Sequence, residues 1–246
     1  MRVLLAESDP NAARGVSLML KADGAAVDQT GTGGGAFELA QRYNYDIILL
    51  ELALPDIGGC EVIRRIRAAR NDTPVLVLSG LGRTGEKVEA LSEGADDFLA
   101  KPFDRAELIA RIRAIIRRCH GHRHASLQVG PLQINLDSHE VLAGGKSVLL
   151  TGKEYAVLEL LVLRKGTVLG KEAFLTHLYG GMDEPEVKII DVFICKLRKK
   201  LAAAGAGSLI GTVWGRGYMI RDPNAGTPRE HGLPHETVVM SEMNAA

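Results

Sequence analysis

The sequence predicts an α/β protein in two parts: a doubly wound domain with a five-stranded parallel sheet, then a smaller domain of short strands, helices and a hairpin. Three observations favour this fold class. Apolar runs alternate with helical segments up to residue 118, short strands separated by turn residues begin at residue 127, and a basic amphipathic segment followed by a hairpin pattern lies after residue 185. Strands that alternate with helices are typical of a parallel sheet covered on both faces.

Length and composition limit the possible functions. At 246 residues the chain can bury two cores, and its formal net charge of zero means that binding a polyanion requires a local basic patch. Cys60, Cys119 and Cys195 lack a Cys-x-x-Cys spacing, which suits a reducing compartment. No apolar run approaches the roughly 18 residues of a membrane span. The sequence therefore predicts a cytoplasmic protein without a membrane partner.

The first part, residues 1–118, repeats one strand–helix unit. We expect strands at 2–6, 26–29, 46–52, 74–79 and 98–100, and helices at 12–20, 35–42, 60–69, 85–91 and 105–118. Functional groups of a doubly wound sheet gather at the carboxyl ends of its strands. The candidates there are Glu7, Ser8, Asp9, Glu51, Ser79 and Lys101.

One loop in this part has a second interpretation. Residues 31–36 are Gly-Thr-Gly-Gly-Gly-Ala, which matches a Gly-x-Gly-x-x-Ala nucleotide loop, and Glu51 follows about twenty positions after it. However, this loop comes after the second strand rather than the first. The sequence therefore favours a flexible loop over a nucleotide site.

Residues 1–118 resemble the receiver domain of two-component response regulators. The resemblance rests on the strand-end residues and on the segment Gly94-Ala-Asp-Asp-Phe-Leu-Ala-Lys-Pro-Phe103. It implies that an acidic pair holds Mg²⁺, that an Asp ending the third strand accepts a phosphoryl group, and that Ser79 and Lys101 contact the phosphoryl oxygens. It also implies that Phe98 rotates inward as a switch and that the Lys101–Pro102 bond is cis.

Two positions depart from that receiver pattern. Glu51 stands where the acceptor Asp should be, and Ser8 stands where the second metal-binding acid should be, which leaves Glu7 alone. Mg²⁺ requires several hard oxygen ligands in near-octahedral geometry. We therefore expect weak or absent Mg²⁺ binding, no other cofactor and little phosphorylation.

Glu51 leaves several hypotheses open. Its carboxylate could imitate a phosphoryl group and hold the receiver in an active-like state, or it could merely pair with Lys101 in a frozen docking module. The leading alternative is a receiver that a kinase or an adaptor protein still controls. The hypothesis of an enzyme is not favoured, because the sequence offers neither a nucleophile–base pair nor an intact metal site. We therefore assign no catalytic residues.

The segment 185–201 predicts a helix that begins at Pro185, with Asp183 as its cap. Its apolar residues recur at helical spacing and predict a buried face: Val187, Ile190, Ile194, Leu197 and Leu201. The opposite face is basic, and a hairpin carrying Arg216 follows. A helix for the major groove and a hairpin for the backbone or minor groove form a winged helix that binds DNA. The plainer alternative is a solvated helix before an ordinary hairpin.

Residues 127–222 resemble the OmpR/PhoB-type winged-helix effector domain, and residues 119–126 form a polar linker. The resemblance rests on a capping box at Thr151 and Glu154, on Val213-Trp-Gly-Arg-Gly-Tyr218 and, most narrowly, on residues 178–201, which are similar to cell-cycle regulators of alphaproteobacteria. It implies a sequence-specific transcriptional regulator of promoter DNA. Carried over by position, Lys188 and Arg198 hold phosphates, Lys196 reaches base edges, Lys199 adds a backbone contact and Arg216 acts in the wing.

The same resemblance implies a homodimer through the receiver. Charged residues expected at that interface are Lys87, Asp96, Asp97, Glu107, Arg111 and Arg118. Because surface ion pairs are individually weak, these charges would set orientation more than affinity, and a solvated face is the alternative. RNA polymerase is a further expected partner.

Residues 223–246 form a polar, Pro-containing tail that cannot build a core. The similar regulators end in Ala-Ala, which an ATP-dependent protease reads. Ala245 and Ala246 are therefore the expected degradation signal, read by a protease or an adaptor, and an unread tail is the alternative.

Overall fold

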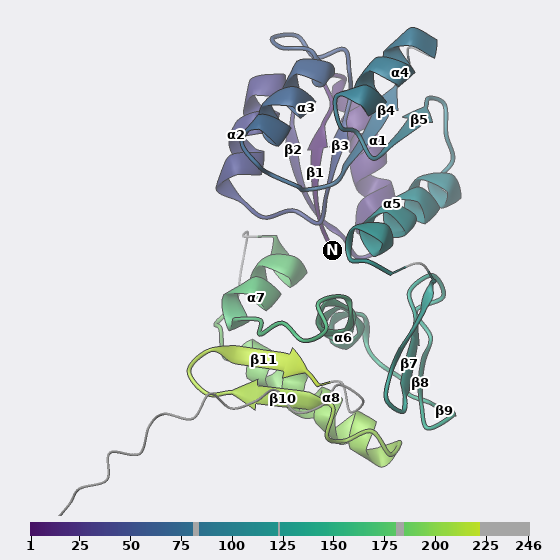
Figure 1. Ribbon diagram of the computed structural model, residues 1–246, viewed down its shortest axis with the longest axis vertical. Helices are drawn as coiled ribbons and strands as arrows, with labels where there is room; N and C mark the ends of the chain where they lie inside the picture. Colours follow the sequence, from purple (N-terminus) through teal and green to yellow (C-terminus); the bar gives the residue numbers. More distant parts are fainter. Residues whose placement is uncertain (81–83, 123, 181–184, 222–246) are drawn as a thin grey trace, which may run out of the picture.

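The computed structural model describes residues 1–80, 84–122, 124–180 and 185–221. Two domains follow one another along the chain (Figure 1). Within the described residues, no helix combines the length and the apolar character that crossing a membrane requires. Asp183, the expected tail and the expected signal at Ala245 and Ala246 lie outside the described residues.

The first domain is the predicted α/β doubly wound fold. Its elements are β1 (Arg2–Ala6), α1 (Pro10–Lys21), β2 (Ala26–Thr30), α2 (Gly33–Arg42), β3 (Ile47–Leu50), α3 (Gly59–Ala68), β4 (Val75–Ser79), α4 (Thr84–Ser92), β5 (Asp97–Ala100) and α5 (Arg105–Cys119). The strands form one sheet in the order β2-β1-β3-β4-β5, and every pairing is parallel. The sequence prediction of five alternating strands and helices is confirmed.

The parallel sheet separates two hydrophobic layers. Val3 and Leu5 of β1 pack with α1 and α5, whereas Leu4 and Ala6 pack with α2, α3 and α4 (Figure 1). Strands buried on both faces must be apolar at every position, which is why they appear as continuous runs instead of alternating ones. The polar residues that follow those runs therefore collect at the carboxyl edge of the sheet.

The second domain has a small antiparallel sheet, three helices and a hairpin. Its elements are β6 (Ser126–Val129), β7 (Leu132–Asn135), β8 (Val141–Ala143), β9 (Lys146–Ser147), α6 (Gly152–Leu163), α7 (Lys171–Tyr179), α8 (Ile189–Ala203), β10 (Ile210–Val213) and β11 (Gly217–Ile220). Thr151 and Glu154 form the predicted capping box at the start of α6. One core joins these elements through the buried faces of α6 and α8.

Helix α8 differs from its prediction at the N-terminal end. It begins at Ile189 rather than at Pro185, because residues 186–188 form a turn whose carbonyls accept from the N–H groups of Ile189 and Ile190 at 2.9 and 3.2 Å. Val187 precedes the helix, so the helical period does not apply to it, and its side chain is 37% exposed. The other four predicted core residues, Ile190, Ile194, Leu197 and Leu201, are buried.

The two domains meet through α7. This helix lies against the amino-terminal ends of β1 and β2, whereas α8 and the β10–β11 hairpin lie on the far side of the second domain (Figure 1). His177 of α7 is buried, and its Nδ1 lies 3.1 Å from Oδ2 of Asp46. The same oxygen of Asp46 accepts a hydrogen bond from the N–H of Arg2 at 2.7 Å. The first domain therefore covers α7 and leaves the basic helix α8 open.

Candidate functional site

A buried lysine–carboxylate cluster occupies the carboxyl edge of the receiver sheet. Glu7 follows β1, Glu51 follows β3 and Lys101 follows β5. Nζ of Lys101 lies 2.5 Å from Oε2 of Glu7 and also binds Oε2 of Glu51. The two carboxylate side chains are only 3% and 8% exposed. One ammonium group is therefore shared by two buried carboxylates.

The second oxygen of each carboxylate also has a partner. Oε1 of Glu51 accepts hydrogen bonds from the N–H groups of Leu52 and Ala53 at 2.8 and 3.3 Å. Oε1 of Glu7 accepts from the N–H of Asp9 at 3.0 Å. The longer side chain of Glu51 thus places one oxygen on Lys101 and the other on the loop after β3.

The protonation of Lys101 follows from these contacts. Burial opposes the charged form, but the hydrogen bonds to Glu51 and Glu7 outweigh it and raise the pKa of the ammonium group above its ordinary value. Lys101 is therefore charged at any physiological pH.

The other predicted receiver residues surround this cluster. Ser79 ends β4 and is fully buried, and Phe98 of β5 is buried in the core on the α4 side, so its ring points inward. Ser8 is exposed, and its hydroxyl donates to the carbonyl of Ala53 at 3.3 Å. The carboxylate of Asp9 caps α1 by accepting from the N–H of Asn11 at 2.8 Å. The Lys101–Pro102 bond is cis, as the resemblance implies.

The glycine-rich loop before α2 binds a carboxylate of the chain itself. The N–H groups of Gly33 and Gly34 donate to Oδ1 and Oδ2 of Asp56 at 2.7 and 2.8 Å. Hydrogen bonds from the N–H groups of Gly34, Ile57 and Gly33 lower the pKa of Asp56 to about 2. An anion already fills the helix N-terminus, so this geometry favours a capped turn over the nucleotide loop.

The outer face of α8 is basic and accessible. Lys188, just before the helix, and Lys196 and Lys199 within it are exposed, and within the described part of the chain none of the three forms an ion pair or a side-chain hydrogen bond. Val192 and Cys195 are exposed on the same face. Such a surface combines cations for phosphates with apolar groups for base edges.

The hairpin after α8 forms the predicted wing. Strands β10 and β11 pair antiparallel, and the turn between them exposes Arg216 and Trp214, the latter to 91%. Arg198 differs from the lysines of α8, because its guanidinium donates to the carbonyl of Ile210 and to the hydroxyl of Thr212 in the wing. The expected binding of a DNA phosphate by Arg198 would therefore compete with these internal hydrogen bonds.

Four of the six residues expected at a dimer interface lie together, whereas Arg118 and Asp96 have separate contacts. Lys87, Asp97, Glu107 and Arg111 lie together on α4, β5 and α5, where Arg111 bridges Asp97 at 2.9 Å and Glu107 at 2.8 Å. Lys87 covers the ring of Phe98, with Nζ 5.8 Å from its centroid. The guanidinium of Arg118 turns back to the carbonyl of Ala114 within α5.

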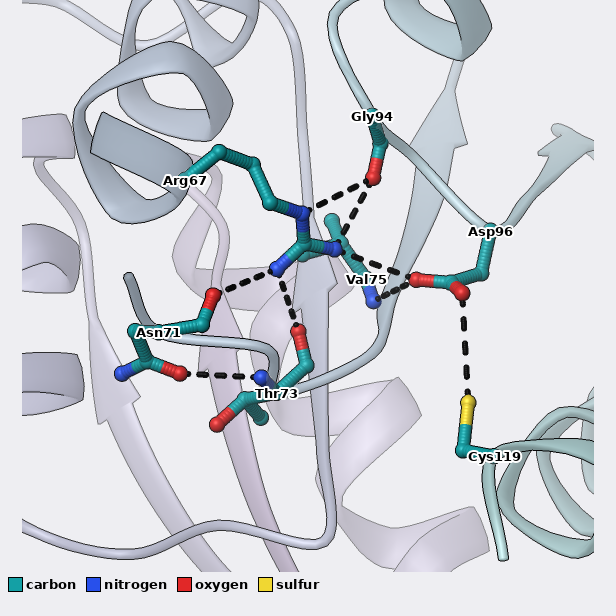
Figure 2. A network of polar contacts seen from close by, with 7 residues as sticks. All are labelled: Arg67, Asn71, Thr73, Val75, Gly94, Asp96 and Cys119. Carbon is teal, nitrogen blue, oxygen red and sulfur yellow. Dashed lines mark hydrogen bonds and ion pairs between the residues drawn. The ribbon is translucent and has the colours of Figure 1, made fainter. Parts of the chain in front are cut away.

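Asp96 belongs instead to an internal network around Arg67 (Figure 2). Oδ2 of Asp96 accepts from the N–H of Val75 at 2.8 Å and from Nη2 of Arg67 at 3.2 Å. Arg67 also donates to the carbonyls of Gly94, Asn71 and Thr73. The carboxylate of Asp96 thus holds the loops before β4 and β5 together, and its expected interface role stays a prediction.

A five-stranded receiver domain joined to a winged helix with an open basic face defines a class of protein, the response regulator that acts on DNA. Residues 3–113 match the response regulator receiver domain family, and residues 145–220 match the family described as transcriptional regulatory protein, C terminal. The chain is 56% identical over 226 residues to the cell cycle response regulator CtrA of Brucella anthropi, an alignment that covers 92% of this chain and 97% of that protein. The homologue from Brucella ovis gives the same identity and coverage.

The chain therefore belongs to the CtrA family of cell cycle response regulators, and it is a DNA-binding transcriptional regulator. Among solved structures, the response regulator DrrB of Thermotoga maritima, an OmpR/PhoB homologue, is 28% identical, with 89% of this chain and 98% of that chain covered and a TM-score of 0.43.

Sequence reasoning missed three contacts that shape these sites: Asp46 with His177 between the domains, Arg67 with Asp96, and Arg198 with the wing. Each joins residues distant in the chain through a polar side chain. No periodicity or spacing marks such pairs. Only the conspicuous position of a charged residue beside an apolar run could have pointed to Asp46.

Proposed function

We propose that this regulator binds promoter DNA without phosphorylation, because Glu51 takes the place of the phosphoacceptor. The observation that carries the proposal is the bridge from Lys101 to both Glu7 and Glu51. An acid that receives a phosphoryl group needs a carboxylate oxygen that is free to attack the phosphorus of the donor. Here the carboxylate of Glu51 is buried and both of its oxygens have partners.

The residues present do not fit Mg²⁺. A metal site at this edge needs carboxylate oxygens free of competing cations, in near-octahedral array. The ammonium of Lys101 already lies against one oxygen of Glu7 and one of Glu51, and Ser8 supplies a hydroxyl where a second acid would be required. We therefore derive no metal-dependent step for this receiver.

Glu51 supports an active-like receiver as a partial imitation of a phosphoryl group. It carries a single negative charge, against roughly 1.5 to 2 for a phosphoryl group. Its two oxygens nevertheless contact Lys101 and backbone N–H groups, and Phe98 is turned into the core. The inward ring is the state that the family resemblance associates with a switched receiver.

The test is promoter-fragment affinity at fixed salt, measured with and without Mg²⁺ and an acyl-phosphate donor. We expect no change for the natural sequence and weaker binding for Glu51→Ala. A donor-dependent rise in affinity would instead favour a receiver that a kinase still controls. If Glu51→Ala and the natural sequence bind with equal affinity, the receiver is a passive scaffold and Glu51 does not activate it.

A matched pair of variants makes the test sharper. Glu51→Asp alone restores the acceptor but not the second metal-binding acid, so we expect it to remain unphosphorylated. Adding Ser8→Asp supplies that acid, and the double variant should accept phosphate from the donor in a Mg²⁺-dependent way. Incorporation by the natural sequence would contradict the proposal.

We further propose a homodimer through α4, β5 and α5, with RNA polymerase as a later partner on the promoter. Exposed Val88 and Leu91 lie on α4, on the same element as Lys87. Arg111 would share its carboxylate partners with a second copy, which is the reciprocal contact of a two-fold interface. Arg111→Glu should lower the mass measured by light scattering at micromolar concentration, whereas Arg14→Glu on α1 should not.

A further inference from the structure

Arg198 connects α8 to the wing, the hairpin formed by β10 and β11. Its Nη2 donates to the carbonyl of Ile210 at 2.9 Å and to the hydroxyl of Thr212 at 2.8 Å, and its Nε donates to the same carbonyl at 3.2 Å. The guanidinium carbon also lies 5.7 Å from the ring centroid of Tyr218, on the opposite strand. One side chain of α8 thus contacts both strands of the wing.

A second contact fixes the wing to the start of the same helix. The hydroxyl of Tyr218 donates to Oδ1 of Asp191 at 2.6 Å, and Nζ of Lys171 binds Oδ2 of that residue at 2.8 Å. These bonds connect β11, the first turn of α8 and the first turn of α7. The wing is therefore held at two levels along α8, by Asp191 and by Arg198.

An isolated two-stranded hairpin is only marginally stable, so the wing depends on its contacts with the rest of the domain. Strands β10 and β11 have four residues each. A third chain segment adds a single bridge between Leu169 and Tyr218. Ile210, Tyr218 and Ile220 pack the hairpin into the core shared with α8, and the Arg198 and Tyr218 side chains add the polar bonds between α8 and the wing.

We propose that Arg198 is a positioning residue for DNA binding: it sets the wing against α8 so that Arg216 and the lysines of α8 meet DNA together. Arg198 then acts through the wing and is not a phosphate ligand in its own right. The planar fork of a guanidinium suits this task, since two of its nitrogens reach acceptors on one strand while its face packs on an aromatic ring. A lysine keeps the charge but cannot reproduce that fork.

The decisive variant is Arg198→Lys, compared with Arg198→Ala for affinity to a promoter fragment at several salt concentrations. We expect both variants to bind about 10-fold more weakly than the natural sequence and to behave alike. A phosphate ligand would give a different result, because Lys would keep most of the affinity and the salt slope while Ala would lose both. That second pattern would overturn the proposal.

A double-mutant cycle tests whether Arg198 acts through the wing. Arg198→Ala should cost far less in an Arg216→Ala background than in the natural sequence, because both changes remove the same wing contact. Lys199→Ala is the matched control, and its effect should add to that of Arg216→Ala. Additive effects of Arg198→Ala and Arg216→Ala would contradict the assignment.

Trp214, the only tryptophan in the chain, reports directly on the wing. We expect faster local decay of its fluorescence anisotropy in Arg198→Lys, while the thermal unfolding midpoint shows that the domain remains folded. Thr212→Val removes one acceptor of Arg198 without changing any charge, so it should shift anisotropy and DNA affinity in the same direction and to a smaller extent. Unchanged anisotropy in both variants would contradict the proposal.

Discussion

Charged side chains gather in two regions of this protein, and their circumstances are opposite. At the carboxyl edge of the receiver sheet, Lys101 is enclosed with Glu7 and Glu51 and binds both. On the outer face of α8, Lys196 and Lys199 are exposed, and no ion pair or side-chain hydrogen bond occupies either of them within the described residues. The charges of the first region are paired within the domain, whereas those of the second region remain available to a polyanion.

The difference separates stability from binding. Removing one member of a buried ion pair leaves an uncompensated charge in a poorly solvated place, which is strongly destabilising. Removing an exposed lysine costs the fold almost nothing, but it removes a cation that would release counterions from DNA. Changes to the lysines of α8 should therefore lower DNA affinity with little effect on stability, whereas changes to the buried cluster should lower stability strongly.

The largest effect is expected at Lys101. Lys101→Met leaves the carboxylates of Glu7 and Glu51 buried without their cation, so the free energy of unfolding should fall by about 3–5 kcal/mol. Urea denaturation followed by circular dichroism measures this loss. Combining Lys101→Met with Glu7→Gln and Glu51→Gln should recover much of the stability. No recovery would mean that packing, rather than uncompensated charge, causes the loss.

The next effect concerns the open face of α8. The triple variant Lys188→Ala, Lys196→Ala, Lys199→Ala should bind a promoter fragment at least about 100-fold more weakly, and its slope of log affinity against log salt should fall by about 2 to 3. Its unfolding midpoint should stay within a few degrees of the natural protein. A triple change of exposed Arg14, Lys21 and Lys146 to Ala is the matched control. Equal losses in both triples would indicate a nonspecific charge effect.

A third prediction concerns Glu159 of α6, a half-buried carboxyl group. Burial raises the pKa of Glu159 from 4.5 to about 7, and its carboxylate accepts from the hydroxyl of Tyr155 at 3.4 Å. Between those two pKa values the folded state holds a proton that the unfolded state has released. The contribution of Glu159 to stability therefore declines as pH rises from about 4.5 to 7.

That decline should amount to about 3 kcal/mol and should disappear in Glu159→Gln. The measurement is the free energy of unfolding at a series of pH values, taken on both proteins. Parallel pH profiles for the two proteins would show that Glu159 titrates normally.

The smallest effect is expected at the joint between the domains. Asp46→Asn keeps an acceptor for the N–H of Arg2 but replaces the carboxylate that accepts from Nδ1 of His177, which should loosen the contact by about 1–2 kcal/mol. Proteolytic cleavage of the linker 119–126 should become several-fold faster. Affinity for DNA should not change, because α7 and not α8 is the covered helix. An unchanged cleavage rate would show that Asp46 does not hold the domains together.

Local sequence patterns predicted most of the fold. The apolar runs of β1, β3 and β4 identified buried parallel strands, because a strand covered on both faces has no polar position to reveal. The three- and four-residue steps of Ile190, Ile194, Leu197 and Leu201 identified the buried face of α8. The capping box at Thr151 and Glu154 marked the start of α6. The start of α8 was placed too early, because Pro185 satisfies the preference for a first helical position without being helical.

The sequence by itself determined the two domains, the substitutions Glu51 and Ser8 at the receiver site and the basic face of α8, since these are properties of residue type and spacing. Tertiary structure alone decided what each charge does. Lys101 joins acids that lie 94 and 50 residues away in the chain, Arg198 turns into the wing, and Asp46 meets His177 of the other domain. Ion pairing and hydrogen bonding depend on separations of a few ångströms in space, and only the folded chain sets those separations.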